Sequence, residues 1–490
     1  MAKRVAVIDI GSNSARMVIY EKTSRFAFHL LHETKVKVRI SEGAYKNDGN
    51  LQELPMQRTL FALKDFINIA SFFKARKTLC VATSALRDAP NKKEFLQRVR
   101  KELKLNIKII DGQKEAYFGA IACANLLPKQ RDALSIDIGG GSSEFAYIDN
   151  YNVSHTISLK LGTVRLKELF FDTNNIEEAI KYIDTELSKL PTLNISTLIG
   201  IGGTFRAISN SILKLENHPL NKLHAYQYTA VQLQDFIFKI LDAKDGDELK
   251  KLLIKPNRFD VIKPGALILQ RVLKQLNISD VITSGVGVRE GVYLADLLRN
   301  SKHKFPANFN TSLRYIIDTH IPDKNFSNIL SRLTKQIFDE VHQKLDLDIK
   351  YKRILTIASK LYHAGNSIHF YSQHKHTYYI IQSALEYGFT HQEIMLISTI
   401  SRFAKSKAPN ETYLKQYETL LPETTTTINL SFILMLSVAL LSHRPREIDF
   451  NIKLTKNKLQ VLSKADLYLA KDAVDKLEFP HKLSLEFLSS

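Results

Sequence analysis

The sequence has little cysteine and no apolar run long enough to span a membrane, and both absences narrow the class of protein. The two cysteines, Cys80 and Cys123, are too few for a disulfide framework or a cysteine-based zinc site, and their apolar surroundings are typical of buried thiols. The most apolar run, Leu430–Leu441, is far shorter than the roughly 20 residues that cross a bilayer, so we expect a buried helix. The first residues lead into a strand-like run without the apolar core of a signal peptide. We therefore expect a cytoplasmic protein.

Length and charge set the scale of the molecule and leave two interpretations of its surface. At roughly 100 to 200 residues per domain, 490 residues predict about three to four domains. The formal net charge of +19 is uneven: residues 1–130 carry +12, residues 131–300 carry none and residues 301–490 carry +7. The two basic segments either face a polyanion or simply place many lysines in solvent.

The first 300 residues alternate between strand-like and helix-like patterns, which is typical of an α/β fold. The expected strands are Val5–Ile10, Arg16–Tyr20, Phe26–His32, Lys35–Ile40, Thr78–Ala82, Ile107–Ile110 and Glu144–Ile148. The expected helices are Met56–Lys74, Asn91–Leu103 and one that begins near Gln113.

An internal echo indicates that the fold repeats itself. Val5–Ser14 (VAVIDIGSNS) and Leu134–Ser143 (LSIDIGGGSS) share an apolar strand, Ile-Asp-Ile, glycine and serine. Glycine allows close backbone approach, so a row of N–H groups at each hairpin could bind a phosphate. Two more strand–glycine–helix turns follow at Thr197–Ile208, with a helix from near Thr204, and at Val281–Gly291. None of the four turns has the spacing of a P-loop, and neither late turn has that of a dinucleotide-binding loop.

From about Ser301 glycine becomes rare and helical spacing dominates, so we expect a separate helical domain. Its expected helices include Ile329–Leu345, Arg353–Tyr362 and Tyr378–Tyr387, and the polar run Glu423–Thr427 is expected to be a loop. The alternation in Phe450–Leu462 predicts two short strands, followed by a helix at Lys464–Lys476. The expected domains are therefore residues 1–130, 131–300, 301–445 and 446–490.

Six segments, in order, carry a resemblance to a known family: VAVIDIGSNSARMVIYE, ATSALRDAPN, IIDGQKEAYFGA, LSIDIGGGSSEFAYID, LIGIGGTFRAIS and ITSGVGVREGVYL. Together they resemble the exopolyphosphatase and guanosine pentaphosphate phosphatase family over residues 1–300. The resemblance implies two actin-like (ribonuclease H-like) domains with a cleft between them, then a helical HD-like domain, to which we add a small α+β C-terminal unit. It also implies hydrolysis of a terminal phosphoanhydride of inorganic polyphosphate or guanosine pentaphosphate. Neither a membrane nor a specific nucleic acid is expected as a partner.

The expected chemistry needs a metal, a base and phosphate-binding groups. Carboxylates at glycine turns suit Mg²⁺, and the candidate ligands are Asp9, Asp137 and Glu144; the alternative is that the aspartates cap their own turns and Glu144 is an outward strand residue. The resemblance assigns the general base to Glu115, and we expect the dipole of its helix to lower the pKa of this carboxylate. The candidate phosphate-binding residues are Ser12, Asn13, Ser14, Arg87, Gly139, Gly140, Gly141, Ser142, Ser143, Gly202, Gly203, Thr204 and Arg206. Arg16 is assigned no chemistry.

The helical domain departs from the pattern of a metal-dependent HD hydrolase. Such a site needs adjacent His-Asp, whereas His363 is followed by Ala364, so the cluster His363, His369, His374 and His376 is not expected to form a metal centre. The basic residues Lys375, Arg402, Lys405 and Lys407 either line a channel for a polyanion or lie on solvated helix faces.

Two other function classes remain open from the residues alone. An actin-like kinase would need an acceptor for the phosphate, and a non-catalytic sensor would use the fold only for binding. The resemblance also suggests a homodimer, although the sequence has no self-complementary stripe that would support one.

Overall fold

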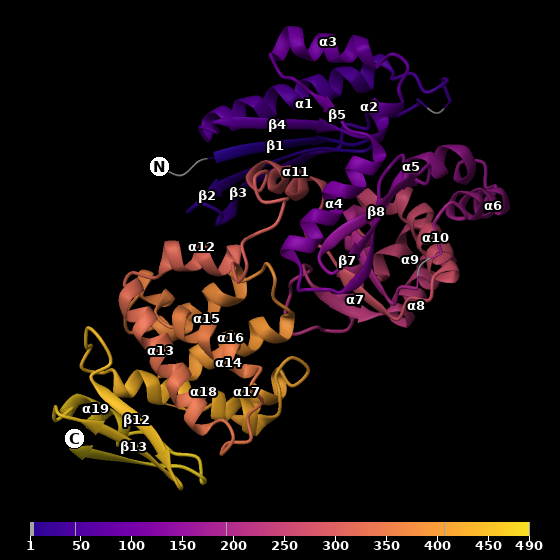
Figure 1. Ribbon diagram of the computed structural model, residues 1–490. Coiled ribbons are helices and arrows are strands. Elements are labelled where there is room, and N and C mark those ends of the chain that lie inside the picture. The colour runs from indigo at the N-terminus through magenta and orange to yellow at the C-terminus, as the bar shows by residue number, and fades with distance from the viewer. Residues whose placement is uncertain (1–3, 45, 193, 406, 490) are drawn as a thin grey trace. The chain divides into compact units, whose positions relative to one another are not determined.

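The computed structural model describes residues 4–44, 46–192, 194–405 and 407–489. The chain divides into two compact units, with the boundary between Phe309 and Asn310 (Figure 1). Within the described ranges, no helix is both long and apolar enough to cross a membrane.

The first unit begins with a five-stranded sheet in the order β3-β2-β1-β4-β5. Its strands are β1 (Arg4–Ile10), β2 (Ala15–Lys22), β3 (Phe28–Val36), β4 (Lys77–Ala82) and β5 (Lys108–Ile109). The first three strands form an antiparallel meander, and β4 and β5 run parallel to β1. Strand β1 is buried on both faces, which explains its continuous apolar run. Helices α1 (Glu53–Phe72) and α3 (Lys92–Leu103) contribute Leu63 and Phe95 to the core on one face of this sheet.

The second sheet of this unit repeats the first and confirms the internal echo. It has the order β10-β11-β9-β6-β7-β8, in which β8-β7-β6-β9-β11 matches β3-β2-β1-β4-β5 in pairing and direction. Its strands are β6 (Asp132–Ile138), β7 (Ser143–Asp149), β8 (Asn152–Leu159), β9 (Thr197–Ile201), β10 (Tyr226–Thr229) and β11 (Asp280–Thr283). Both glycine hairpins therefore lie at the same position in their sheets, between the first and second strands.

Two helices link the halves of the first unit. Each follows a strand of one sheet in the chain but packs on the other sheet. Helix α4 (Gly112–Leu126) follows β5 but packs on the second sheet, where Ala116, Ala120 and Cys123 join its core. Helix α11 (Val288–Leu297) follows β11 but packs on β1 and against α4 (Figure 1). The domain boundary expected near residue 130 stays a prediction.

The remaining elements of this unit are short connections or cover the second sheet. They are α2 (Ser84–Asp88), α5 (Thr163–Leu166), a π-helical turn (Lys167–Phe171), α6 (Ile176–Leu187), α7 (Gly202–Leu215), α8 (Ala230–Asp242), α9 (Gly246–Lys251), a 3₁₀ turn (Pro256–Arg258) and α10 (Phe259–Gln275). Both cysteines are buried and unpaired, as the sequence predicts.

The second unit is helical with a small sheet at its C-terminal end. Its helices are α12 (Thr311–His320), α13 (Lys324–Val341), α14 (Tyr351–Leu361), α15 (Gln373–Ala384), α16 (His391–Phe403), α17 (Glu411–Gln416), α18 (Thr424–Leu440) and α19 (Tyr468–Val474), with a 3₁₀ turn at Ala364–Ser367. Its strands are β12 (Phe450–Thr455), β13 (Lys458–Ser463) and β14 (Ser484–Ser489). Helix α18 is the expected buried apolar helix and packs against α13, α14, α16 and α19.

Several local expectations are wrong. Phe26–His32 and Lys35–Ile40 are not two strands, because residues 28–36 form the single strand β3 and a turn follows it. The run Glu423–Thr427 is not a loop, since α18 begins at Thr424 and Thr427 is already buried against the apolar helix that follows. Helix α7, by contrast, begins at Gly202, close to its expected start near Thr204. The pattern did not indicate β14, which pairs in parallel with β13.

The close packing of α4 and α11 predicts a difference between two glycines. A Cβ added at Gly291 would overlap the backbone carbonyl of Phe118, whereas one at Gly119 would meet only the side-chain end of Ile201 at 3.3 Å. Gly291→Ala should therefore lower the free energy of unfolding by about 2–3 kcal/mol, because two helix backbones must separate. The matched control Gly119→Ala should change it by less than about 1 kcal/mol. Urea unfolding measures both, and equal losses would contradict this packing.

Candidate functional site

The two glycine hairpins end at one cavity of about 150 Å³ in the first unit. Asp9 lies near the end of β1 and Asp137 near the end of β6, and both face this cavity. It is lined by these predicted residues: Asp9, Ser12, Asn13, Ser14, Glu115, Asp137, Gly139, Gly140, Ser142, Gly202, Gly203, Thr204 and Arg206. Segments more than 190 residues apart in the sequence thus meet at one place.

Two glycines permit the close approach of these segments. A Cβ on Gly140 would lie 2.9 Å from Cβ of Ser12, so the tips of the two hairpins can meet only if one of them is glycine. Gly202 has a φ of +84°, and a Cβ there would overlap the carboxylate of Asp137. The start of α7 is therefore positioned directly against this carboxylate.

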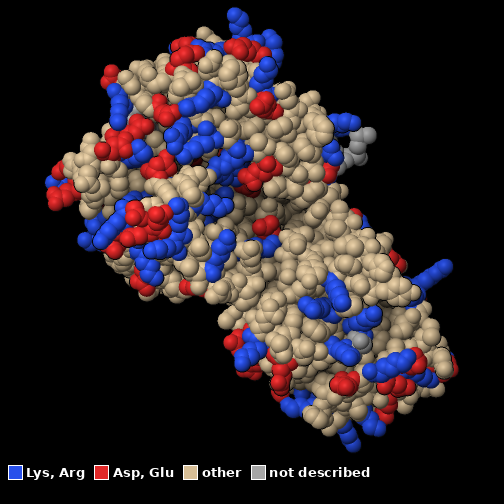
Figure 2. Space-filling view, turned by 180° about the vertical axis from the view of Figure 1, so that it is seen from behind, with Lys and Arg blue, Asp and Glu red and all other residues tan. Residues whose placement is uncertain are grey.

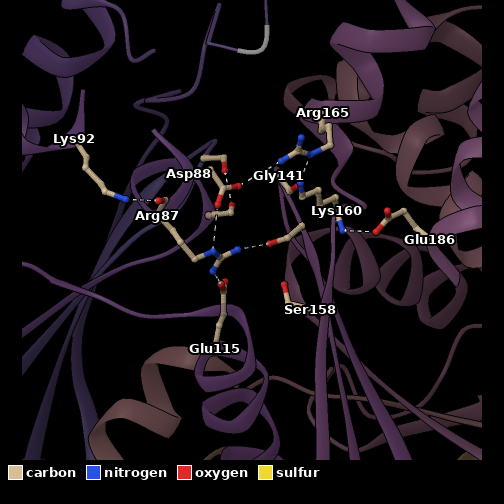
Figure 3. Close-up of polar contacts among 12 residues, drawn as sticks. Arg87, Asp88, Lys92, Glu115, Gly141, Ser158, Lys160, Arg165 and Glu186 are labelled. Atoms are coloured by element: carbon tan, nitrogen blue, oxygen red, sulfur yellow. Dashed lines mark hydrogen bonds and ion pairs between the residues drawn. The ribbon is translucent and has the colours of Figure 1, made fainter. Parts of the chain in front are cut away.

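Glu115 is buried in the first turn of α4, where Arg87 holds it. Nη1 of Arg87 donates to Oε2 of Glu115 at 3.0 Å, and Nη2 donates to Oγ of Ser142 at 3.4 Å (Figure 3). The guanidinium thus connects the base candidate to the tip of the second hairpin. Asp111 caps the helix by accepting a hydrogen bond from the backbone N–H of Lys114.

The expectation that the helix dipole lowers the pKa of Glu115 is wrong. Burial raises this pKa well above its usual range, and the nearby carboxylate of Glu144 raises it further, while Arg87 acts in the opposite direction. Burial of this group depends on tertiary packing, which the local sequence does not show. The carboxyl group of Glu115 consequently holds a proton more tightly than an exposed glutamate does.

Glu144 belongs to this buried carboxyl pair more than to the cavity wall. Its carboxylate accepts a hydrogen bond from Ser158 at 2.8 Å, and burial raises its pKa to about 7. In the described part of the chain, no three or more His, Cys, Asp or Glu side chains are arranged as a metal site. The metal role predicted for Glu144 stays a prediction.

Asp9 and Asp137 fit a divalent cation better. Burial raises the pKa of both carboxyls, that of Asp137 to about 6, which indicates that the surrounding positive charge does not offset the cost of burying their negative charge. Mg²⁺ is commonly held by one or two carboxylates and completes its shell with water and substrate oxygens. The chemistry of these two groups therefore fits such an ion.

Cations line the same cavity as these carboxylates. Arg206 is fixed by donating to the backbone oxygens of Ser284 at 2.9 Å and Val286 at 3.3 Å. The sequence interpretation missed four further basic residues of the cavity: Arg16, Lys35, Arg258 and Arg289. Burial and neighbouring guanidinium groups lower the pKa of Arg16 to about 10 and that of Lys35 to about 8. These cations repel one another, so a bound anion would stabilise them.

The internal repeat carried a signal for one of the missed residues. In the first hairpin Asp9 pairs with Arg16, and in the second Asp137 pairs with Glu144, so Arg16 and Glu144 occupy equivalent positions. The chemistry assigned to Glu144 could have been extended to this position. The other three residues lie outside the two hairpins: Lys35 is in β3, Arg258 is in the turn that precedes α10, and Arg289 is in α11.

Four predicted residues do not line the cavity and instead contact neighbouring groups of the first unit. Arg87 and Glu144 form the contacts described above, and the carbonyl of Gly141 accepts from Nε of Arg165 at 2.8 Å (Figure 3). The hydroxyl of Ser143 donates to the carbonyl of Leu161 at 2.5 Å. Substrate binding by Arg87, Gly141 and Ser143 and the metal role of Glu144 stay predictions.

The histidines of the second unit have a different environment. His363 is buried, and its Nε2 accepts a hydrogen bond from Arg444 at 3.1 Å. Burial and this guanidinium lower the pKa of His363 to about 4, so the ring is neutral near pH 7. Arg402 lies over the rings of Tyr378 and Tyr413. A channel along the second unit stays a prediction.

Surface charge does not by itself identify a partner. Figure 2 shows Lys and Arg side chains interspersed with Asp and Glu over this face of the first unit. The cluster of basic side chains that lines the cavity is therefore more informative about a partner than the net charge of the chain.

Comparisons with known proteins match both units. The sequence profile of the Ppx/GppA phosphatase family matches residues 18–300, and that of Ppx/GppA phosphatase domain III matches residues 310–481. A guanosine-5'-triphosphate,3'-diphosphate pyrophosphatase of Photobacterium profundum is 26% identical over 81% of this chain and 79% of its own length. A bifunctional 3-dehydroquinate synthase/phosphatase of Fusobacterium nucleatum is 32% identical over 57% of this chain, which spans 44% of that relative.

Solved structures agree on the fold. A Ppx/GppA family member from Aquifex aeolicus has a TM-score of 0.54 and 28% identity, covering 61% of this chain and 99% of its own. An exopolyphosphatase from Cytophaga hutchinsonii has a TM-score of 0.56 and 23% identity, covering 62% of this chain and 100% of its own.

The raised pKa of Asp137 predicts a pH-dependent gain of stability in Asp137→Asn. Between pH 3.8 and about 6 the folded state holds a proton that the unfolded state releases, so the wild type loses stability as pH rises through this window. Without divalent cations the variant should be about 1–3 kcal/mol more stable at pH 7.5, and the gain should vanish near pH 4.

Urea unfolding at both pH values measures this gain. Asp132→Asn, at the exposed start of the same strand, is the matched control and should show no such gain. A variant that is less stable than wild type at pH 7.5 would contradict the proposed burial of an uncompensated charge.

Proposed function

The chain belongs to the Ppx/GppA phosphatase family, and from that premise we propose that it hydrolyses the terminal phosphoanhydride of inorganic polyphosphate or guanosine pentaphosphate. One relative is named as a guanosine pentaphosphate pyrophosphatase and one solved structure as an exopolyphosphatase, which supports both substrates. The observation that carries the proposal is a buried glutamate, held by an arginine, at a cavity lined by basic groups and glycine turns.

The cavity offers complementary groups for a phosphate chain. Arg16, Arg206 and Arg258 supply guanidinium donors that match phosphate oxygens. Backbone N–H groups at the tips of the hairpins and at the start of α7 add further donors. Such groups are fixed before substrate arrives, so little reorganisation opposes the reaction.

Glu115 is the residue that we propose accepts the proton of the attacking water. The water oxygen bonds to the terminal phosphorus, the bond from that phosphorus to the bridging oxygen breaks, and the shortened chain leaves. The raised pKa of Glu115 makes it a stronger base than an exposed glutamate once it has lost its proton. Arg87 positions the carboxylate and favours its ionised form. Asp9 and Asp137 would hold Mg²⁺, which when bound neutralises phosphate charge.

The two buried thiols support a reducing compartment such as the cytoplasm as the place of this reaction.

Replacement of Glu115 tests the mechanism most simply. Glu115→Gln should lower phosphate release from polyphosphate about 10²- to 10⁴-fold, because the amide cannot accept the proton. The control is Glu53→Gln, since Glu53 also lies in the first turn of a helix and pairs with an arginine, Arg98, but is exposed. The assay measures phosphate from long-chain polyphosphate and from guanosine pentaphosphate, with Mg²⁺ and no acceptor. Unchanged release by Glu115→Gln would refute the proposed base, and no release by wild type would refute the hydrolase.

Cations of the cavity should determine substrate affinity. Arg16→Gln and Arg258→Gln should each raise KM for polyphosphate about 10- to 100-fold, because each removes charge-assisted hydrogen bonds to phosphate. Each should also weaken the dependence of kcat/KM on salt, since fewer cations neutralise the polyanion. Arg100→Gln, at an exposed position on α3, should change neither quantity. If both variants leave KM unchanged, these arginines do not bind the substrate.

A further inference from the structure

A second basic cavity of about 410 Å³ lies at one end of the strands of the first sheet, and the catalytic cavity lies at the other end. The start of β1, the end of β2, the start of β4 and the end of α11 line it, all within the first unit. The catalytic cavity lies at the other end of β1, beside Asp9. The volume of the second cavity is in the range of sites that bind small molecules.

This cavity carries a large excess of positive charge. Six basic residues line it against one carboxylate, that of Asp296: Arg4, Lys22, Arg25, Arg76, Lys77 and Arg299. Asp296 pairs with Lys77 at 2.5 Å and with Arg299 at 3.7 Å, and Arg4 pairs with Glu21 at 2.7 Å. Among the residues that line the cavity, positive charges therefore outnumber negative ones six to one, which favours a multivalent anion.

A buried hydroxyl independently indicates a ligand. Tyr293 lines the cavity and is 1% exposed, and its hydroxyl has no hydrogen-bond partner among the described residues. Its ring is fixed by Tyr20 at 4.5 Å and Phe28 at 4.8 Å between centroids. A buried hydroxyl without a partner is unfavourable, and a small shift of Tyr293 that exposed this hydroxyl to the cavity would let a phosphate oxygen accept its hydrogen bond.

Helix α11 joins the two cavities. Its first residues, Val288 and Arg289, line the catalytic cavity, and its later residues Tyr293, Asp296 and Leu297 line the second one. Tyr20, which packs on Tyr293, donates to Oε1 of Glu290 at 2.5 Å. Oε2 of Glu290 in turn accepts from the backbone N–H of Gly287 at 2.7 Å, and Gly287 lines the catalytic cavity. A shift of Tyr293 would therefore reach the catalytic cavity through one short, buried helix.

We propose that the second cavity binds an oligophosphate anion and that α11 couples its occupancy to the catalytic cavity. An oligophosphate matches both the excess positive charge and the free donor of Tyr293. The anion could come from an inorganic chain or from a nucleoside polyphosphate, which share this chemistry. The proposal rests on the second cavity and does not require that the first one hydrolyses the same anion.

Calorimetric titration with inorganic tripolyphosphate tests the site in the full-length Glu115→Gln protein. We expect two binding events per chain, and the same count for wild type in EDTA. Arg16→Gln in the Glu115→Gln background identifies the event at the catalytic cavity. Adding Tyr293→Phe should weaken the other event at least tenfold, whereas Tyr468→Phe, at an exposed position, should not. Arg25→Ser with Arg299→Ser is an independent second variant and should weaken the same event.

The outcomes separate the site, its ligand and the coupling. A single event, or two events that Tyr293→Phe leaves unchanged, overturns the site; the melting temperature of this variant should stay within about 2 °C of its parent because the hydroxyl has no protein partner. GTP that binds at the second site supports a nucleoside polyphosphate as the natural ligand, and GTP that does not supports an inorganic chain. By linkage, filling the second cavity should change the Kd at the catalytic cavity about fivefold or more, and Tyr293→Phe, which leaves the second cavity empty at the same anion concentration, should remove this change; a Kd at the catalytic cavity that does not depend on occupancy of the second cavity overturns the coupling.

Discussion

The candidate site depends on burying charges of the same sign beside one another. Glu115 lies near Glu144, and Arg16 lies near Arg206 and Arg289, in surroundings that exclude much of the solvent. Each set would be unstable alone, because burial favours the neutral form of every group. The pKa values respond accordingly: those of the carboxyls rise and those of Arg16 and Lys35 fall. Bound phosphates would compensate the buried cations, and a divalent cation held by Asp9 and Asp137 would compensate the negative charge of the cavity.

The duplicated sheet explains how one fold places both signs at one point. Each half presents an Asp-Ile-Gly hairpin at the same position, and the residue opposite the aspartate is a cation in one half and a carboxylate in the other. Arg16 therefore lines the cavity, where we propose that it binds phosphate, while its counterpart Glu144 joins the buried carboxyl pair with Glu115. The exchange of α4 and α11 between the sheets brings Glu115 and Arg289 to the same cavity. Duplication followed by divergence of a few residues is sufficient for this asymmetry.

Sequence patterns predicted the repeated halves and most of the hairpin residues that line the cavity, because strand periodicity and glycine turns are local signals. They failed where tertiary packing decides. The strand β3 continues through a polar stretch because β2 pairs with it, and Thr424–Thr427 is helical because the apolar helix that follows is buried. Lys35, Arg258 and Arg289 could not be predicted, since basic residues are common and nothing local indicates a cavity. The pKa of Glu115 was misjudged for the same reason: its burial and its distance to Glu144 are properties of the folded chain.

The pH dependence of kcat/KM for phosphate release, measured in wild type and in Arg87→Gln, tests the central claim that Glu115 is the base. Since burial and Glu144 raise its pKa and Arg87 lowers it, the wild-type rate should rise with pH through an apparent pKa above 4.5 and then level off. Arg87→Gln should move this apparent pKa upward, because the opposing cation is lost. A wild-type profile that is flat from pH 5 to 8, or an apparent pKa that Arg87→Gln leaves in place, would contradict the assignment of Glu115 as the base.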